Sequence, residues 1–357
     1  MRIHQVQLYQ LDLPLHTPYV VSTRSIYSFD PLVVRIQTDS GEQGWGEVLI
    51  AKRYSHETLE GAWTFCLQQA QALLGLSLAD AHQQLSQHSQ QHPGATSAML
   101  LALDMLALSP ILYSAENKTV PLLAPVQARS FEDLPEEIET LLDNGFRTLK
   151  VKVGFDWEQD LRKVERIQEL VHNRALLRLD ANQSYSRSDA KQFAQRLSPD
   201  NIELLEQPCA ADDWAVLPEI AALSTVPLML DESIYGTEDI MRAASIEGVA
   251  FIKLKLKKIG SVQALIKALE LIRQEGMEPV LGDGVGSDIC CWAEAMVAAL
   301  AINGAGEMNG FLKTQESLFE RPLTMHQGNM LIPAQYQPLI YHTKIARLAS
   351  KTSEIIQ

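Results

Sequence analysis

The chain has 357 residues, of which 44 are acidic and 30 are basic, so its formal net charge is −14 and its pI is near 5.1. This excess of negative charge argues against nucleic acid or an anionic membrane surface as the main partner. No run of about 18 apolar residues exists, so no membrane span is predicted. The four cysteines lack CxxC spacing, which is typical of reduced thiols in a cytoplasmic enzyme.

Strand-like sequence comes first in the chain, and helical sequence follows it. Residues 1–15 alternate apolar and polar side chains like a strand, and they lack the long apolar core of a signal peptide. Two further strand-like runs follow before residue 50, with a turn at 39–41. Residues 56–110 have helical periodicity with a break near Pro93. We therefore predict a separate α+β domain over residues 1–120.

A different pattern begins at residue 121, where short apolar runs alternate with amphipathic segments of helical period. Repeated strand and helix units predict an α/β architecture in which a parallel sheet closes into a (β/α)8 barrel of about 200–250 residues. We assign the barrel to residues 121–325 and expect residues 326–357 to pack back on the first domain. The eight predicted strands are 122–128, 148–154, 176–182, 202–208, 227–233, 250–256, 278–284 and 306–313.

Charged residues close the central predicted strands at nearly constant intervals. Lys150 and Lys152 lie in the second strand, and successive steps of 28, 26, 25 and 24 residues lead from Lys152 to Asp180, Glu206, Asp231 and Lys255. A single acid at a strand end is more often a cap or turn residue than a ligand. Three acids in register with the lysines favour an active site, because polar residues at the carboxyl ends of barrel strands are typically catalytic.

The order of the strands turns this spacing into a chemical hypothesis. In an eight-stranded barrel the second and sixth strands lie opposite each other, so Lys152 and Lys255 should face one another with the three acids between them. Converging carboxylates repel unless a cation binds there, and an oxygen-only site suits Mg²⁺, with Mn²⁺ as the second choice. Such a cation can bind a substrate carboxylate and stabilise the enediolate that forms when the adjacent carbon loses its proton. The two lysines would act on opposite faces of that carbon, with pKa values lowered by the metal and by Lys150.

These residues resemble the motifs of the enolase superfamily, in the subgroup that contains muconate-lactonizing enzyme, dipeptide epimerases and o-succinylbenzoate synthase. The resemblance covers nearly the whole chain and rests on KxK at 150–152, LDAN at 179–182, EQP at 206–208, DES at 231–233, KxxKxGS at 255–261 and GWGE at 44–47. It implies a modified (β/α)8 TIM barrel with an N-terminal α+β capping domain. It also implies Asp180, Glu206 and Asp231 as Mg²⁺ ligands, and Lys152 and Lys255 as the acid and base.

The chain departs from this family's pattern at Lys253, where a smaller polar residue is usual, and at Ser261, which replaces a second glycine. Lys253 has the same parity as Lys255 along the strand, so alternation would allow either to point inward. An additional buried lysine would need a carboxylate partner, and Glu232 is one candidate. We expect Asn182 of the LDAN motif and Glu232 to support the site.

Histidine is absent between His172 and His326. The mandelate racemase group, which this chain resembles in fold, uses a histidine at the end of strand seven as a base. The absence argues against that group, and also against zinc hydrolases, which rely on histidine ligands.

Specificity in this family depends mainly on two loops of the capping domain and on the ends of strands seven and eight. The residues predicted there are Arg24, Arg53, Tyr54, Asp283 and Glu307. The two acids suggest a cationic group on the substrate, but pairing with a structural lysine or helix capping is an equal alternative. The two arginines could receive a second carboxylate or lie in solvated loops.

Our leading interpretation is a Mg²⁺-dependent racemase or epimerase that performs 1,1-proton transfer next to the carboxylate of a small amino-acid derivative. Dipeptides, N-acyl amino acids and proline betaines are the candidate substrates. A cycloisomerase or syn-dehydratase that uses the same enediolate is the first alternative, and a non-catalytic barrel that binds an acid is the second. We expect a cytoplasmic homo-oligomer.

Overall fold

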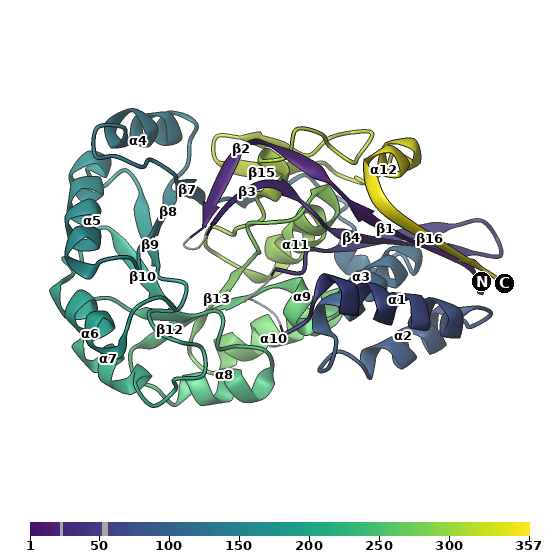
Figure 1. Cartoon of the computed structure of the whole chain (residues 1–357), viewed down its shortest axis with the longest axis horizontal. Coiled ribbons are helices and arrows are strands. Elements are labelled where there is room, and N and C mark those ends of the chain that lie inside the picture. Colours follow the sequence, from purple (N-terminus) through teal and green to yellow (C-terminus); the bar gives the residue numbers. More distant parts are fainter. Residues whose placement is uncertain (22–23, 52–55) are drawn as a thin grey trace.

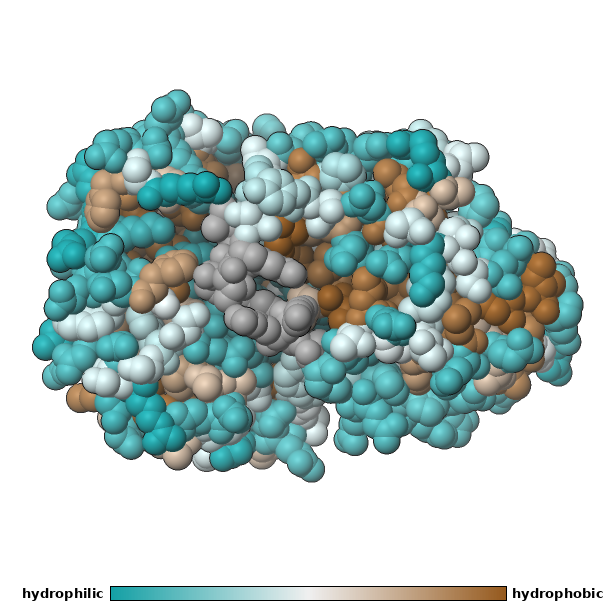
Figure 2. All heavy atoms as spheres, viewed as in Figure 1, coloured by the Kyte–Doolittle hydropathy of each residue, from teal (hydrophilic) through white to brown (hydrophobic). Residues whose placement is uncertain are grey.

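The computed structural model describes residues 1–21, 24–51 and 56–357. A curled parallel sheet with its helices forms one half of the molecule, and a mixed capping part, where the two chain ends meet, forms the other (Figure 1). On the face shown in Figure 2, the outer helices of the sheet half present mainly hydrophilic side chains. None of the described helices is long and apolar enough to cross a membrane.

The capping part is an antiparallel sheet covered by three helices. The sheet has the strand order β16-β1-β4-β5, and a separate two-stranded ribbon is made by β2 and β3. One side of the sheet packs against the helices in a core of aliphatic and aromatic side chains. The elements are β1 (Ile3–Leu11), β2 (Leu13–Val21), β3 (Arg24–Phe29), β4 (Leu32–Thr38), β5 (Gln43–Val48), α1 (Leu59–Leu73), α2 (Leu78–Ser86) and α3 (Pro93–Leu106).

Two glycines of the GWGE motif allow α3 to lie directly on β5. A Cβ atom added to Gly44 would stand 1.9 Å from the backbone oxygen of Ala102. One added to Gly46 would stand 1.8 Å from the backbone oxygen of Ala98. Both distances are far inside van der Waals contact, and helix backbone cannot rotate away as a side chain can. Glycine is therefore required at both positions by close packing and not by backbone torsion.

We predict that Gly46→Ala destabilises the protein by at least about 2–3 kcal/mol, the upper part of the range for overpacked cores. Urea unfolding followed by circular dichroism would measure the change. Gly236→Ala is the matched control, because an added Cβ there meets nothing within 4 Å. Equal midpoints for the two variants would contradict the packing argument.

The other half is a seven-stranded parallel sheet in the order β13-β12-β11-β10-β9-β8-β7, so each strand pairs with its neighbours in sequence. Helices between the strands cover its outer side (Figure 1). The strands are β7 (Ala124–Val126), β8 (Thr148–Lys152), β9 (Leu176–Asp180), β10 (Ile202–Glu206), β11 (Leu228–Leu230), β12 (Val249–Leu254) and β13 (Glu278–Leu281). The helices are α4 (Leu134–Asp143), α5 (Trp157–Val171), α6 (Arg187–Arg196), α7 (Leu217–Leu223), α8 (Thr237–Ala244), α9 (Leu256–Ile259), α10 (Val262–Gln274) and α11 (Asp288–Ala301).

The prediction of an eighth strand at 306–313 is wrong. That segment makes one isolated parallel bridge, from Gly306 to Leu122, and then turns into the short 3-10 helix η2 (Gly310–Leu312). Backbone hydrogen bonds from Glu307 N to Leu281 O and from Gly306 N to Pro121 O still fasten it between β13 and the segment before β7. The segment therefore closes the barrel as an irregular connection. Two glycines and the Asn309 side chain interrupt the apolar run that a strand would need.

The last part of the chain returns to the cap. After the barrel, β14 and β15 form a small antiparallel sheet with β6, which precedes the barrel in the chain. The final strand β16 then pairs along β1, from Ala349 opposite Leu11 to Ile356 opposite Gln5. The remaining elements are η1 (Pro110–Leu112), β6 (Lys118–Pro121), β14 (Thr324–His326), β15 (Asn329–Ile332), α12 (His342–Leu348) and β16 (Ala349–Ile356).

Glu47, at the end of β5, joins the two halves. Its buried carboxylate accepts hydrogen bonds from the backbone N (2.6 Å) and hydroxyl (2.6 Å) of Ser287 and from the backbone N of Cys290 (3.0 Å). Those donors lie at the beginning of α11, where backbone N–H groups need acceptors. Burial raises the pKa of the Glu47 carboxyl, and the three hydrogen bonds oppose this increase.

Candidate active site

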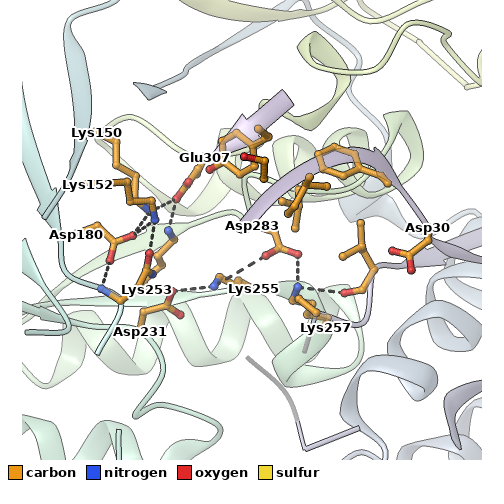
Figure 3. Close-up of a pocket in the computed structure, with 18 of the residues that line it drawn as sticks. Asp30, Lys150, Lys152, Asp180, Asp231, Lys253, Lys255, Lys257, Asp283 and Glu307 are labelled. Atoms are coloured by element: carbon orange, nitrogen blue, oxygen red, sulfur yellow. Dashed lines mark hydrogen bonds and ion pairs between the residues drawn. The ribbon is translucent and has the colours of Figure 1, made fainter. Parts of the chain in front are cut away.

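A cavity of about 380 Å³ opens where the carboxyl ends of the barrel strands meet the cap. Its floor consists of charged side chains from β8, β9, β12 and the connections that follow β11 and β13 (Figure 3). Its roof comes from the β2–β3 ribbon and the residues that follow β3 and β5, and it combines apolar side chains with the polar Ser25, Ser28 and Asp30. The apolar side chains include Tyr19, Ile26, Phe29 and Leu49. Strand alternation places the floor residues, because every second side chain of a barrel strand points inward.

Lys150 is surrounded by carboxylates from three different elements. Its Nζ lies 2.9 Å from Oδ2 of Asp180, 3.2 Å from Oε2 of Glu206 and 2.9 Å from Oε2 of Glu307. All four side chains are buried. Lys150 is therefore a structural counterion at the base of the cavity, where it holds the first two predicted metal ligands close to each other.

Lys253 forms the second link in the same cluster. Its Nζ lies 3.3 Å from Oε1 of Glu206 and also contacts Oε2 of Glu307. The expectation that Glu232 pairs with this lysine is wrong. Glu232 instead accepts a hydrogen bond from Asn182 at 3.2 Å, and Lys253 lines the cavity beside Glu307.

Lys152 lies two residues after Lys150 on β8 and also lines the cavity (Figure 3). Its Nζ lies 2.5 Å from Oδ2 of Asp180 and 2.5 Å from Oδ1 of Asn182. Asn182 has a positive φ of 43°, and its backbone N donates to Oδ1 of Asp180 at 2.9 Å. Asparagine tolerates this left-handed conformation. The LDAN turn therefore orients both the predicted ligand and the predicted base.

Alternating charges continue along the opposite wall of the cavity (Figure 3). The Nζ of Lys255 lies 2.7 Å from Oδ2 of Asp231 and 3.9 Å from Oδ1 of Asp283, and the Nζ of Lys257 lies 2.5 Å from Oδ2 of Asp283. Lys258, on α9, binds Oδ1 of Asp231 from behind at 2.7 Å. The KxxKxG run thus supplies three lysines that position or approach Asp231 and Asp283.

The pKa values of the buried acids follow from this arrangement. Burial would raise the pKa of Asp180, but Lys150 and Lys152 outweigh it and lower the pKa below its usual range. For Asp231, burial is likewise outweighed by Lys255 and Lys258, and its pKa lies well below normal. Both carboxylates are therefore ionised at neutral pH, as metal ligands must be.

Glu206 and Glu232 behave differently. Burial, and then the charge of Asp180, raises the pKa of Glu206. Burial, and then Asp231, raises the pKa of Glu232 to about 7. Burial is the first cause of both shifts, and the nearby lysines oppose them only in part.

Carboxylates determine the pKa values of two buried lysines of the site, and the expected lowering of the base pKa by a metal charge stays a prediction. Burial would lower the pKa of Lys255, but Asp231 and Asp283 outweigh it and raise the pKa well above the ordinary value. Asp180 and Glu206 do the same for Lys150.

The acids in the floor fit a hard divalent cation in chemical type. Asp180, Glu206 and Asp231 follow three adjacent strands and offer only oxygen atoms. Oε2 of Glu232 is buried and lacks a hydrogen-bond partner, which is the state of an oxygen whose natural partner is a cation. Among the described residues, however, no three acidic, histidine or cysteine side chains surround a single point, because lysines engage the carboxylates.

The residues predicted to set specificity have separate outcomes. Asp283 and Glu307 both line the cavity, but each is paired with lysines and is not open to a cationic substrate group. Arg53 and Tyr54 lie outside the described residues, and for Arg24 only the backbone, at the beginning of β3, is described.

Sequence reasoning missed two groups of cavity residues. The motif at 255–261 includes Lys257 and Lys258, but no role was predicted for either side chain. Their spacing on a single helical turn could have placed both beside Lys255. The roof residues of the β2–β3 ribbon had a weaker signal, which was the alternation of apolar residues over 13–29.

Residues 133–336, more than half of the chain, match the family profile described as Enolase C-terminal domain-like, and residues 3–97 match the profile described as MenC, N-terminal domain. The chain belongs to the enolase superfamily. This confirms the resemblance drawn from the KxK, LDAN, EQP and DES motifs.

Three relatives in the superfamily are informative. L-Ala-D/L-Glu epimerase from Bacillus subtilis is 30% identical over 84% of this chain and 85% of its own. N-succinyl-L-Arg/Lys racemase from Bacillus cereus is 26% identical over 88% of each chain. Its solved structure has a TM-score of 0.90 over 99% of this chain and 100% of its own at 23% identity, which confirms the barrel and cap architecture.

The third relative is a dipeptide epimerase from Methylococcus capsulatus, solved with Mg and the dipeptide L-Arg-D-Lys. Its structure has a TM-score of 0.82 and 26% identity over 96% of this chain and 100% of its own. The curated relatives are racemases and epimerases, and this member of the superfamily is accordingly an isomerase. Magnesium is present in solved structures of the family.

Proposed function

We propose that this enzyme is a Mg²⁺-dependent racemase or epimerase that removes and returns the proton next to the carboxylate of an amino-acid derivative. The observation that carries the proposal is the position of two lysines in one cavity. Lys152 comes from β8 and Lys255 follows β12, with β9, β10 and β11 between them. Two bases on opposite sides of a substrate carbon are what inversion of its configuration requires.

Asp180, Glu206 and Asp231 would hold the Mg²⁺, with Glu232 beside them. When bound, Mg²⁺ would supply Lewis-acid stabilisation of negative charge on the substrate carboxylate. The chain itself performs the proton transfer. One lysine must be neutral to accept the proton and the other must be protonated to deliver one to the opposite face. Asn182 orients Lys152 through the 2.5 Å contact to its Nζ, and Asp283 supports Lys255.

Substrates with an acylated amino group are favoured over substrates with a free cation. Asp283 is engaged by Lys257, and Glu307 by Lys150 and Lys253, so neither has a free carboxylate oxygen pair for a substrate ammonium. The apolar roof residues Ile26, Phe29 and Leu49 suit an uncharged chain and exclude water from the reacting carbon.

The proposal is tested by NMR in D₂O. Pools of N-acyl amino acids, dipeptides and proline betaines are incubated with the enzyme and Mg²⁺, and loss of the α-proton signal is recorded. We expect exchange for members of one pool, its loss on chelation with EDTA and its return when Mg²⁺ is restored. Exchange that persists in EDTA would contradict the metal-dependent mechanism. A new alkene absorbance without exchange would instead indicate dehydration or cycloisomerisation.

We also propose a reducing, cytoplasmic location. Cys66, Cys209, Cys290 and Cys291 are all buried and free. Burial raises the pKa of each thiol, so they act as small apolar residues of the core.

A further inference from the structure

A second cavity, of about 340 Å³, lies beside the first at the ends of β7 and β8. It is enclosed by the connection from β7 to α4 and by the connection from β8 to α5. Lys152 lines both cavities, so the second space begins at the side chain that we assign to proton transfer. A substrate arm that passes this side chain from the first cavity would enter the second.

Two aromatic side chains on the rim of this cavity are exposed to an unusual degree. Phe131 is 48% exposed and Phe155 is 61% exposed. The backbone around Phe155 is held in place, because Oδ2 of Asp160 accepts hydrogen bonds from Gly154 N at 2.9 Å and from Phe155 N at 3.0 Å. Large apolar groups that a rigid loop presents beside a reactive side chain are typical of a ligand site.

The charged residues of the cavity are unequally engaged. The two acids of the lining, Asp156 and Asp160, both accept hydrogen bonds that stabilise the fold. Asp156 caps α5 by accepting from Gln159 N at 2.9 Å. Asp160 accepts from the Tyr185 hydroxyl at 2.7 Å in addition to its two backbone contacts. In contrast, Arg129 and Lys163 form no ion pair or hydrogen bond with any side chain in the described ranges. Burial lowers the pKa of Lys163, and the charges of Asp160 and Glu137 oppose this change without an ion pair. The two cations are therefore available to an anion.

We propose that this cavity binds an apolar arm of the substrate that ends in a carboxylate. Phe131 and Phe155 would contact the arm, and Arg129 with Lys163 would bind its terminal anion. The inference rests on the proposed function, since it extends the substrate past Lys152. It deepens that function by selecting N-acyl amino acids with a second carboxylate, and it agrees with the engagement of Asp283 and Glu307 by lysines in the first cavity.

The arm can belong to the acyl group or to the amino-acid side chain, and matched substrates distinguish these sources. N-succinyl-alanine carries the second carboxylate on the acyl group, N-acetyl-glutamate carries it on the side chain, and N-acetyl-methionine carries none. We expect the wild type to exchange the α-proton of at least one dicarboxylate with a kcat/KM about tenfold or more above that of N-acetyl-methionine, which is the effect of one charge-assisted hydrogen bond.

Variants of the two cations then test the site directly. Arg129→Gln, Lys163→Gln and the double variant should remove this preference through KM and leave kcat and the turnover of N-acetyl-methionine unchanged. Phe131→Ala and Phe155→Ala should raise KM for all substrates with a long arm. The controls are Arg166→Gln, because Arg166 lies on α5 and pairs with Glu169 at 2.8 Å, and Tyr113→Ala, because Tyr113 is 46% exposed elsewhere.

Equal kinetics of the double variant and the wild type on every dicarboxylate would overturn the inference while leaving the racemase proposal intact. If no compound exchanges its α-proton, the proposed function is refuted. Calorimetric binding of N-succinyl-phenylalanine then tests whether the second cavity binds a carboxylate. Binding that the double variant weakens about tenfold supports the anion site. Equal binding to both proteins, or none to the wild type, refutes it.

Discussion

Lys152→Ala should abolish the interconversion of the two substrate epimers, with a fall in rate of at least about a thousandfold, while one epimer still exchanges its α-proton with solvent. General acid and base groups contribute about 10²–10⁴ to rate, and inversion needs both lysines. The remaining Lys255 can still take a proton from its own face and return a deuteron to that same face. NMR in D₂O, with each pure epimer assayed separately, would measure both reactions.

Lys255→Ala should give the mirror-image result, in which only the other epimer exchanges. Lys191→Ala is the control, because that lysine pairs with Glu219 on the outer surface at 2.5 Å and should leave both reactions unchanged. If both active-site variants exchanged the same epimer, the lysines would not act on opposite faces, and the assignment of two bases would fail. Wild-type epimerisation by either variant would also refute it.

Lys253→Ala should destabilise the enzyme by about 3–5 kcal/mol in the presence of EDTA, because removal of one partner leaves buried negative charge without compensation. Lys253 contacts both Glu206 and Glu307, and all three side chains are buried. The shift in the urea midpoint measures the effect.

Two further measurements separate charge from packing at this position. The double variant Lys253→Met with Glu307→Gln should recover much of the lost stability, because it removes the charges together and keeps the volume. Added Mg²⁺ should also restore part of the stability of Lys253→Ala, because a cation near Glu206 replaces the missing ammonium. A Lys253→Ala midpoint equal to that of the wild type would show that the buried ion pairs contribute nothing.

The sequence was sufficient for those parts of the site that depend on periodicity. Strand ends at Lys152, Asp180 and Glu206 follow from apolar runs that stop at a charged residue, and parallel strands carry their ends to one edge. The positions of Lys150 and Lys253 on the inner face follow from alternation with the residues two places beyond them. These inferences need only local spacing, which a single chain displays directly.

Partner choice could not be predicted in the same way. Lys253 pairs with Glu307, 54 residues away, and no local rule distinguishes that acid from Glu232 as its partner. The prediction of an eighth strand was wrong for a related reason. Backbone hydrogen bonds to Pro121 and Leu281 hold residues 306–313, so tertiary contacts and not strand propensity determine their conformation. The second cavity depends on the exposure of Phe131 and Phe155, which a sequence does not reveal.

The hydrogen bonds of Glu47 make the cap and the barrel a single thermodynamic unit. Separation of the halves would leave a buried carboxylate and three donors at the beginning of α11 without partners at once, so opening between them is disfavoured. Heat or denaturant should then produce one cooperative transition and not two. In recombination between relatives, an exchanged cap would need an acid at the position of Glu47 to accept from the beginning of α11, so this contact ties the inheritance of the cap to that of the barrel.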